Sequence, residues 1–414
     1  MVGRFIIFFL IISVIELYFL QAVKTFVQDF SGSKKNIILY TAYTLVAINV
    51  VMGLVALVYP PPNWSNGMRL FMSGFLILAI CKLFGISFLL IDDIIRLFRW
   101  IFSFFQSAPE GAVEVSHKIS RLKFMSQLAI TFTVIPAVGF LYGMVRGAYK
   151  YRVHKVIVPS PNLPEAFNGF KIVQLSDIHT GSFLDTDALN KAFDIVMQQG
   201  ADIILFTGDL VNNESTETAG FESTFSRLKA PHGVYSVLGN HDYGDYKQWE
   251  SKQAKIQNLE DLKKVHANAG WRLLMNEHVA IEKDGQKIGL LGIENWGGNM
   301  NFPKYGRMDL AHKGSEVYPY KILMSHDPSH WEKQVQPEYP DIDLTLSGHT
   351  HGMQLGIEIP GFRFSPSQWV YKQWAGLYKH QNQFIYVNRG LGFLGYPGRL
   401  GIWPEITVIE LQKV

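Results

Sequence analysis

Cysteine is almost absent from this chain of 414 residues, which contains only Cys81, within an apolar run. A single cysteine excludes an intrachain disulfide and a metal site built from several thiolates. Charge is also scarce, since Asp, Glu, Lys and Arg make up 18% of the residues and the formal net charge is +3. With no dense Lys/Arg run and no base-stacking motif, so small a charge argues against a nucleic-acid partner.

The charged residues are unevenly distributed along the chain. They are sparse before about Arg146 and of ordinary frequency after it, while hydrophobic residues make up 48% of the whole. A chain of this length exceeds the usual size of a single core. We therefore expect a transmembrane region in residues 1–150 and a second domain in residues 170–414. The intervening residues 151–169 contain Pro159, Pro161 and Pro164, which predict an extended linker or an edge strand.

Four apolar stretches of the first region are long enough to cross a membrane, because about 30 Å of hydrocarbon takes roughly 20 apolar residues in a helix. They cover about residues 5–23, 37–59, 70–91 and 124–144. The first contains Glu16 and the third contains Lys82, each of which would cost a few kcal/mol if it faced lipid. We expect both to face protein as a packing contact. The alternative is an ion pair on a transport path.

Basic residues near the predicted spans bear on membrane orientation. The first and third connections are the richer ones, with Lys24, Lys34, Lys35, Arg96, Arg99, Lys118, Arg121 and Lys123. By the positive-inside rule these connections face the cytoplasm and the second domain lies outside it. A second basic group directly follows the fourth span and favours the opposite orientation: Arg146, Lys150, Arg152 and Lys155.

From Phe170 onward, short apolar runs alternate with stretches of helical spacing. The runs predict buried strands at residues 171–175, 203–206, 234–238, 288–291, 322–324, 344–346 and 384–387. Helical spacing appears at residues 185–199 and 259–269. This alternation predicts an α/β fold in which helices cover the sheets, and ligands gather at the carboxyl ends of strands in such folds.

Five polar clusters follow predicted strands. They are Asp177-Ile178-His179, Gly208-Asp209, Gly239-Asn240-His241-Asp242, His326, and Gly348-His349-Thr350-His351. Oxygen and imidazole donors together suit divalent Mn, Fe, Zn or Mg. D-x-H and H-x-H each project two donors from one side of an extended segment. The glycines let the backbone turn sharply and approach an ion without a Cβ in the way.

The number of clusters decides between a structural and a functional reading. One isolated histidine is more often a satisfied core or surface residue than a ligand, but five ordered clusters favour a metal centre. Two cations about 3.5–4 Å apart would repel each other strongly without a carboxylate between them. Asp209, on a sharp glycine turn, is the natural bridge.

These motifs, in this order, resemble the calcineurin-like metallophosphoesterase superfamily over about residues 170–414, and most closely its bacterial membrane-attached branch. The resemblance implies a four-layer αββα sandwich after the four helices. It implies two divalent metal ions with a shared ligand, and attack on phosphorus by metal-activated water. The implied ligands of one ion are Asp177, His179, Asp209 and His351, and those of the other are Asp209, Asn240, His326 and His349.

The resemblance also gives His241 the role of the acid that protonates the leaving group. Asp242 would then orient His241, with a helix N-cap as its alternative role. A glycine-rich segment, residues 388–399, contributes Arg389 and Arg399 as candidate contacts for phosphate oxygens. Its aromatic residues are candidates for contact with acyl chains or the bilayer. The alternative is a rigid glycine loop packed against the domain.

These observations predict a membrane-anchored, binuclear metal-dependent phosphoesterase that hydrolyses a phosphate monoester, diester or pyrophosphate. A lipid or lipid-linked substrate is expected, because a tether beside the bilayer raises its effective concentration. The expected location is a bacterial inner or plasma membrane, with multiple spans and the catalytic domain outside the cytoplasm. The alternatives are a membrane sensor or scaffold with a non-catalytic metal-binding domain, and a transporter.

Overall fold

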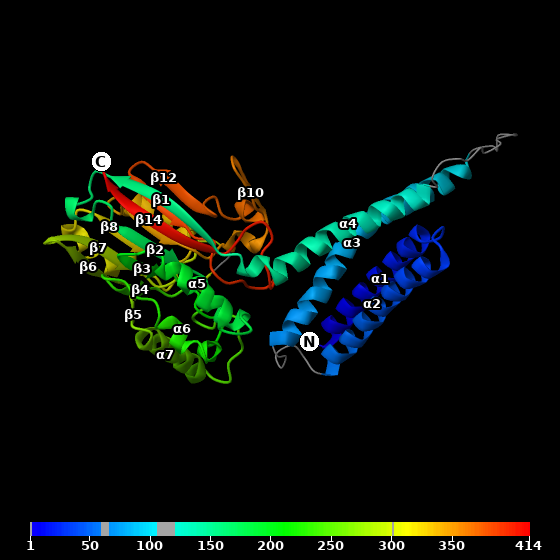
Figure 1. Ribbon diagram of the computed structural model, residues 1–414, viewed down its shortest axis with the longest axis horizontal. Helices are drawn as coiled ribbons and strands as arrows, with labels where there is room; N and C mark the ends of the chain where they lie inside the picture. Colours follow the sequence, from blue (N-terminus) through cyan, green and yellow to red (C-terminus); the bar gives the residue numbers. More distant parts are fainter. Residues whose placement is uncertain (1, 59–65, 106–120, 300–301) are drawn as a thin grey trace. The chain divides into compact units, whose positions relative to one another are not determined.

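The computed structural model describes residues 2–58, 66–105, 121–299 and 302–414 (Figure 1). Lys118, which enters the orientation argument, lies outside the described residues. The chain divides into two compact units, Met1–Tyr142 and Gly143–Val414.

Four long helices begin the chain: α1 (Val2–Phe26), α2 (Gly32–Val58), α3 (Asn66–Ser103) and α4 (Arg121–Val145). Each contains a stretch long and apolar enough to cross a membrane, namely Phe9–Phe26, Gly32–Val55, Leu70–Ser103 and, from α4 onward, Arg121–Tyr149. The prediction of four candidate spans is therefore confirmed. The third is longer than the sequence predicted.

Glu16 and Lys82 pair inside the first unit. The Lys82 Nζ lies 2.6 Å from both Glu16 carboxylate oxygens, and the Asn49 Nδ2 donates to Glu16 Oε1 at 2.7 Å. All three side chains are buried. The pair faces protein, as expected, and it joins α1, α2 and α3. Nearby, Asp92 of α3 pairs with Arg96 at 2.7 Å and with Arg121 of α4 at 2.6 Å.

The second unit contains two six-stranded sheets. The first has the order β1-β14-β2-β3-β4-β5, made of Arg152–Ser160, Glu405–Lys413, Lys171–Leu175, Ile203–Phe206, Val234–Ser236 and Trp271–Leu273. The second has the order β12-β13-β9-β8-β7-β6, made of Gly376–His380, Gln383–Val387, Leu344–Ser347, Lys321–Met324, Gln286–Gly292 and Glu277–Lys283. Strands β2 to β5 are mutually parallel, as are β13, β9, β8 and β7.

Apolar side chains arrange these sheets and helices in four layers. Helices α5 (Asp187–Met197), α6 (Glu222–Phe225) and α7 (Lys252–Asn268) bury their apolar faces on the first sheet. The two sheets face each other through residues such as Ile172, Leu290 and Leu344. On the second sheet lie α8 (Met308–His312) and the turn of π-helix at Trp331–Val335, which continues into the exposed α9 (Gln336–Glu338). This is the predicted αββα order.

Part of the predicted linker is a strand. Residues Arg152–Ser160 form β1, which pairs in parallel with β14 at the edge of the first sheet. Of the two predictions, an extended linker or an edge strand, the edge strand is therefore correct for residues Arg152–Ser160. Pro159 is tolerated there because an edge strand has one side without a partner.

A short ribbon lies outside both sheets. Its strands, β10 (Ile357–Ile359) and β11 (Phe362–Phe364), are antiparallel and pair Ile357 with Phe364 and Ile359 with Phe362 (Figure 1). The ribbon follows the last predicted metal ligand, His351, by a few residues.

Candidate metal centre

The structure brings all seven predicted metal ligands together. They follow strands β2, β3, β4, β8 and β9 and are Asp177, His179, Asp209, Asn240, His326, His349 and His351. Six of them form two groups whose ligand atoms lie within 4.8 Å of one another: Asp177 with His179 and His351, and Asp209 with His326 and His349. The parallel strands meet at one edge of each sheet, which is why residues far apart in sequence converge here.

The first group is almost completely buried. The His179 Nε2 and His351 Nε2 atoms are 3.0 Å apart, and the Asp177 Oδ1 lies 3.2 Å from His351 Nε2. Asp177 and His179 have no exposed surface and His351 very little. The Asp177 carboxylate also accepts from the backbone N–H of His349, at 3.1 and 3.0 Å to its two oxygens. This contact ties the D-x-H and G-H-x-H motifs to each other.

Asn240 completes the second group. Its Oδ1 lies 3.1 Å from His326 Nε2 and 2.7 Å from His349 Nδ1. Asp209 Oδ2 lies 3.1 Å from His326 Nε2 and 3.6 Å from His179 Nε2 of the first group. Asp209 therefore lies between the groups, where a carboxylate shared by two ions would have to be.

The donor set fits a cation, and His326 shows why. Its Nδ1 lies 2.7 Å from the Thr207 carbonyl oxygen and must donate a proton to it. Its Nε2 then faces two acceptor oxygens, those of Asp209 and Asn240. A neutral imidazole that is protonated at Nδ1 would direct the lone pair of Nε2 at both of these oxygens. Burial alone would lower the pKa of His326, but Asp209 raises it to about 10, so the structure favours positive charge at this place.

Four other predicted ligands have pKa shifts that suit a metal ion. Burial alone would raise the pKa of Asp177 and of Asp209, but neighbouring histidines, chiefly His351 and His326 respectively, bring both well below the ordinary value. Burial lowers the pKa of His179 to about 3 and also lowers that of His349. Ionised carboxylates and neutral imidazoles are the forms that coordinate divalent ions.

The backbone at the centre is strained. Five of the seven predicted ligands have φ in the left-handed region: Asp177 at 50°, His179 at 50°, Asp209 at 59°, His349 at 71° and His351 at 50°. Such conformations cost on the order of 1–3 kcal/mol for each non-glycine residue and cluster at functional sites. The strain turns side chains from successive motifs toward one point.

The glycines beside the ligands are needed for close approach. A Cβ on Gly348 would overlap the Ser176 hydroxyl and the Asp177 carboxylate, and a Cβ on Gly239 would overlap the Asp209 carboxylate. Gly208 has φ of 97° and would meet the Gly239 backbone. The sequence predicted that these positions admit no Cβ. The groups that exclude it include the ligands themselves.

His241 lies beside the centre, but Asp242 does not hold its imidazole. The His241 Nδ1 is 2.7 Å from the Asn212 carbonyl oxygen. The Asp242 carboxylate instead accepts backbone N–H groups of Gly239 at 2.8 Å, Asp209 at 2.9 Å, Leu210 at 2.8 Å and Val211 at 3.3 Å. The predicted orienting role is therefore wrong. Asp242 joins the two ligand-bearing turns, and no helix begins at it.

Arg389 and Arg399 are not placed to contact substrate. Both are buried, and Arg389 pairs with Glu405 and Glu358 at 2.5 Å each. Arg399 donates to the carbonyl oxygens of Gly392 and Arg389. Their guanidinium groups hold the glycine-rich segment together, so the prediction of phosphate contacts is wrong. Phe393 is buried as well, which favours the alternative of a loop packed against the domain.

Sequence reasoning missed three residues at the centre. The Tyr371 hydroxyl lies 2.8 Å from His349 Nε2, and the buried Asp327 Oδ2 lies 3.7 Å from the same atom. The Tyr246 hydroxyl accepts from Asn240 Nδ2 at 2.9 Å, and its ring centroid is 4.6 Å from that of His241. Asp327 directly follows a ligand and could have been noticed. The two tyrosines belong to loops without a motif.

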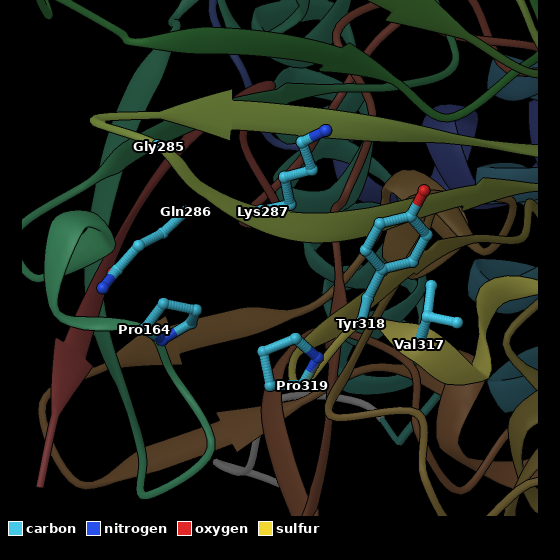
Figure 2. A pocket seen from close by; sticks show the side chains of 7 residues that line it. All are labelled: Pro164, Gly285, Gln286, Lys287, Val317, Tyr318 and Pro319. Carbon is cyan, nitrogen blue, oxygen red and sulfur yellow. The ribbon is translucent and has the colours of Figure 1, made fainter.

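A cavity of about 460 Å³ lies elsewhere in the second unit (Figure 2). Its lining residues are Pro164, Gly285, Gln286, Lys287, Val317, Tyr318 and Pro319. No carboxylate, imidazole or thiol is among them. The cavity is therefore unrelated to the metal centre.

Comparison with known proteins covers both units. A family model described as "Probable Calcineurin-like phosphoesterase, transmembrane domain" matches residues 3–148, and one described as "Calcineurin-like phosphoesterase" matches residues 170–353. The second match includes every predicted metal ligand and His241.

Similar proteins occur in a vertebrate and in bacteria. A Danio rerio transmembrane protein with metallophosphoesterase domain is 31% identical over 289 residues, 68% of this chain and 62% of the relative. The metallophosphoesterase YkuE of Bacillus subtilis is 29% identical over 304 residues, 72% of this chain and 99% of the relative. The phosphodiesterase YaeI of Escherichia coli is 27% identical over 295 residues, 71% of this chain and 99% of the relative.

The match thus spans less than two thirds of the Danio rerio relative and nearly all of the two bacterial ones. The motif order, the αββα layers, the paired groups of ligands and the four apolar helices agree with these matches. The chain belongs to the calcineurin-like metallophosphoesterase family, in a form that carries a transmembrane domain.

Proposed function

We propose that this protein hydrolyses a phosphate ester at a centre of two divalent metal ions. The observation that carries the proposal is the position of Asp209 between two buried groups of histidine and carboxylate ligands. One ion would be held by Asp177, His179, Asp209 and His351, and the other by Asp209, Asn240, His326 and His349. Divalent ions there would supply Lewis acidity to the phosphate and lower the pKa of water.

His241 is the proposed proton donor to the leaving group. Its Nδ1 donates to the Asn212 carbonyl oxygen, which fixes the ring and leaves Nε2 as the atom that exchanges a proton. The ring is only partly buried and lies 5.0 Å, centroid to centroid, from that of the ligand His179. It is thus the imidazole at the edge of the centre that a substrate can reach. General acid catalysis of this kind contributes about 10²–10⁴ in rate.

The proposed substrate is a lipid or lipid-linked phosphate ester. Four candidate spans tether the second unit to a bilayer, where lipid substrates are at high effective concentration. The Escherichia coli relative is named a phosphodiesterase, so a diester is the first ester to test. A comparison of lipid extracts from cells with and without the protein should show one phosphate ester accumulating in its absence. Unchanged lipid phosphate esters would contradict this part of the proposal.

The proposed location is a bacterial inner or plasma membrane, with the catalytic unit outside the cytoplasm. The support is the count of basic residues in the first and third connections. Alkaline phosphatase fused after Val414 should then be active and a green fluorescent protein fused there should be dark. The reverse result would put the metal centre in the cytoplasm.

Hydrolysis is best tested with two diesters that differ in leaving group. Purified full-length protein with Mn²⁺ should hydrolyse both a bis(nitrophenyl) and an alkyl phosphodiester. His241→Gln should retain the bound metal and slow the alkyl diester by about 10²–10⁴, because alkoxide needs a proton to leave. It should slow the nitrophenyl diester far less, because nitrophenolate leaves unprotonated.

Two results would reject the proposal. Wild-type protein that binds metal but hydrolyses neither diester would favour a sensor or scaffold. Equal slowing of both esters by His241→Gln would remove the acid role from this histidine.

A further inference from the structure

One face of the β10–β11 ribbon is apolar and largely exposed among the residues that the structure describes. Ile357, Ile359, Phe362 and Phe364 share this face, since each pairs directly across the ribbon with another of the four. Ile357 is 52% exposed, Ile359 58% and Phe362 53%. Trp369, 74% exposed, lies edge-on to Phe364 with ring centroids 6.0 Å apart. An exposed apolar face of this kind marks an interaction site.

The opposite face of the ribbon is fixed to the domain. Glu358 accepts from the buried Arg389 at 2.5 Å. Arg363 lies over the Trp374 ring, 4.9 Å from its centroid. Since one face is anchored, the apolar face has a fixed direction and cannot turn inward to bury itself.

The base of the ribbon lies beside residues 143–149, the part of the fourth candidate span that belongs to the second unit. The Gly356 N–H donates to the Leu400 carbonyl at 2.9 Å, and the Leu400 N–H donates to Gln354 at 2.8 Å. The preceding residue, Arg399, donates its N–H to the carbonyl of Gly143, in the last turn of α4, at 3.1 Å. Two neighbouring residues of one loop therefore hold the ribbon and the end of the span.

The contact with the span end is close, and its surroundings are typical of a membrane surface. A Cβ on Gly147, within the candidate span Arg121–Tyr149, would overlap the Arg399 carbonyl oxygen. Just beyond, the Lys150 Nζ lies over the Trp403 ring, 4.7 Å from its centroid. Lysine and tryptophan side chains are enriched where helices leave the hydrocarbon. The strands of the ribbon reach about 10 Å, and one headgroup layer is ~5–8 Å deep.

We propose that the apolar face of the β10–β11 ribbon, with Trp369, inserts into the headgroup layer of the bilayer that α4 spans. The bilayer fits this face better than a protein partner does. The face offers five apolar side chains, whereas a standard protein interface uses about 20–30 residues a side. An aromatic and aliphatic surface of this size is typical of interfacial insertion.

Insertion has a consequence for the metal centre. The ligand His351 begins the short 3₁₀ turn His351–Gln354, which leads directly into the ribbon. An inserted ribbon therefore holds the centre beside the headgroups, where lipid phosphates lie. The insertion itself does not depend on catalysis, and its test does not use activity.

The test uses fluorescence of a label on the ribbon. Full-length protein with Cys81→Ser and Phe362→Cys is labelled with an environment-sensitive nitrobenzoxadiazole dye and reconstituted in phosphatidylcholine and phosphatidylglycerol vesicles. We expect emission shifted to the blue, and at least twofold quenching by lipids brominated near the headgroup. Ile359→Cys, on the same face, should behave alike and guards against a perturbed Phe362 site.

The matched control is Val317→Cys. Val317 is also an exposed apolar residue, at 77%, and it lines the cavity of Figure 2 with Gly285 of the β6–β7 turn. That turn and the ribbon are at opposite ends of the second unit (Figure 1). The control label should show neither shift nor quenching. Equal spectra at residues 362 and 317 would overturn the proposal, as would crosslinking of Phe362→Cys between two copies, which would assign the face to a second chain.

Discussion

Each unit of this protein buries a polar cluster, and the two clusters differ in how their charge is balanced. In the membrane unit, Glu16 is neutralised by Lys82 and further satisfied by Asn49. In the catalytic unit, Asp209 and Asn240 both direct acceptor oxygens at His326. The first cluster is complete by itself, while the second calls for cations from solution. This difference distinguishes a packing contact from a candidate metal site.

The backbone supports the same distinction. Glu16, Asn49 and Lys82 lie within ordinary helices. Most of the predicted metal ligands lie in left-handed conformations, which are costly for residues with a Cβ. The strained backbone occurs where it directs side chains toward a candidate ion site. Substitutions in one cluster or the other test this distinction, and they are ordered here from the largest expected effect to the smallest.

Glu16→Ala should give the largest effect, on stability. It leaves Lys82 buried without its counter-charge, which typically costs about 3–5 kcal/mol. The measurement is unfolding of the full-length protein in detergent. The double variant Glu16→Ala/Lys82→Met removes both charges and should recover most of the loss. If the double variant is as unstable as the single one, the pair is not the self-balanced contact described here.

Asp209→Asn should act on turnover rather than on stability. It removes the charge shared by both ligand groups, and we expect diester hydrolysis to fall more than about 100-fold, beyond the loss expected from an outer-shell contact. The matched control is Asp343→Asn. Asp343 is also buried and accepts from Lys321 and Asn162, with no metal ligand among these partners. A similar loss of turnover in both variants would mean that the effect is one of folding.

Asp242→Asn should give an intermediate effect. An amide cannot accept all four backbone N–H groups that the carboxylate holds. The ligand-bearing turns should loosen, and we expect metal affinity to fall about 10–100-fold. Titration with Mn²⁺ measures this. If Mn²⁺ affinity is unchanged while turnover falls, Asp242 has a role in catalysis.

Tyr371→Phe should give the smallest effect. It removes one hydrogen bond to His349, worth about 0.5–1.5 kcal/mol, or roughly tenfold at most in turnover. Tyr378→Phe is the control, because the Tyr378 hydroxyl accepts from the backbone N–H of Trp374 and has no contact with a ligand. A loss of several hundredfold for Tyr371→Phe would mean that this tyrosine contacts the reacting phosphate.

The sequence predicted features that depend on chemistry local to a motif. Each predicted metal ligand follows an apolar strand, and the structure brings these residues together in two groups that could hold metal ions. The spans could be identified from length and apolar composition alone. Each of these signals lies within some twenty consecutive residues.

Features that depend on distant residues escaped prediction. Strand β14 lies between β1 and β2 in the first sheet, and this position cannot be predicted from the apolar pattern of its own residues. Arg389 and Arg399 resemble phosphate ligands in sequence, but both are buried and donate to Glu405 and to carbonyl groups elsewhere in the fold. Asp242 has partners 31–33 residues away. Side chains that pair across the fold cannot be assigned from their neighbours in sequence.

The central claim is that the cluster around Asp209 requires two cations while the cluster around Glu16 requires none. Metal analysis by mass spectrometry of the purified full-length protein after loading with Mn²⁺ tests this most directly. We expect about two ions per chain in wild type and in Glu16→Gln, and at most one in Asp209→Asn. Two ions retained by Asp209→Asn, or none bound by wild type, would contradict it.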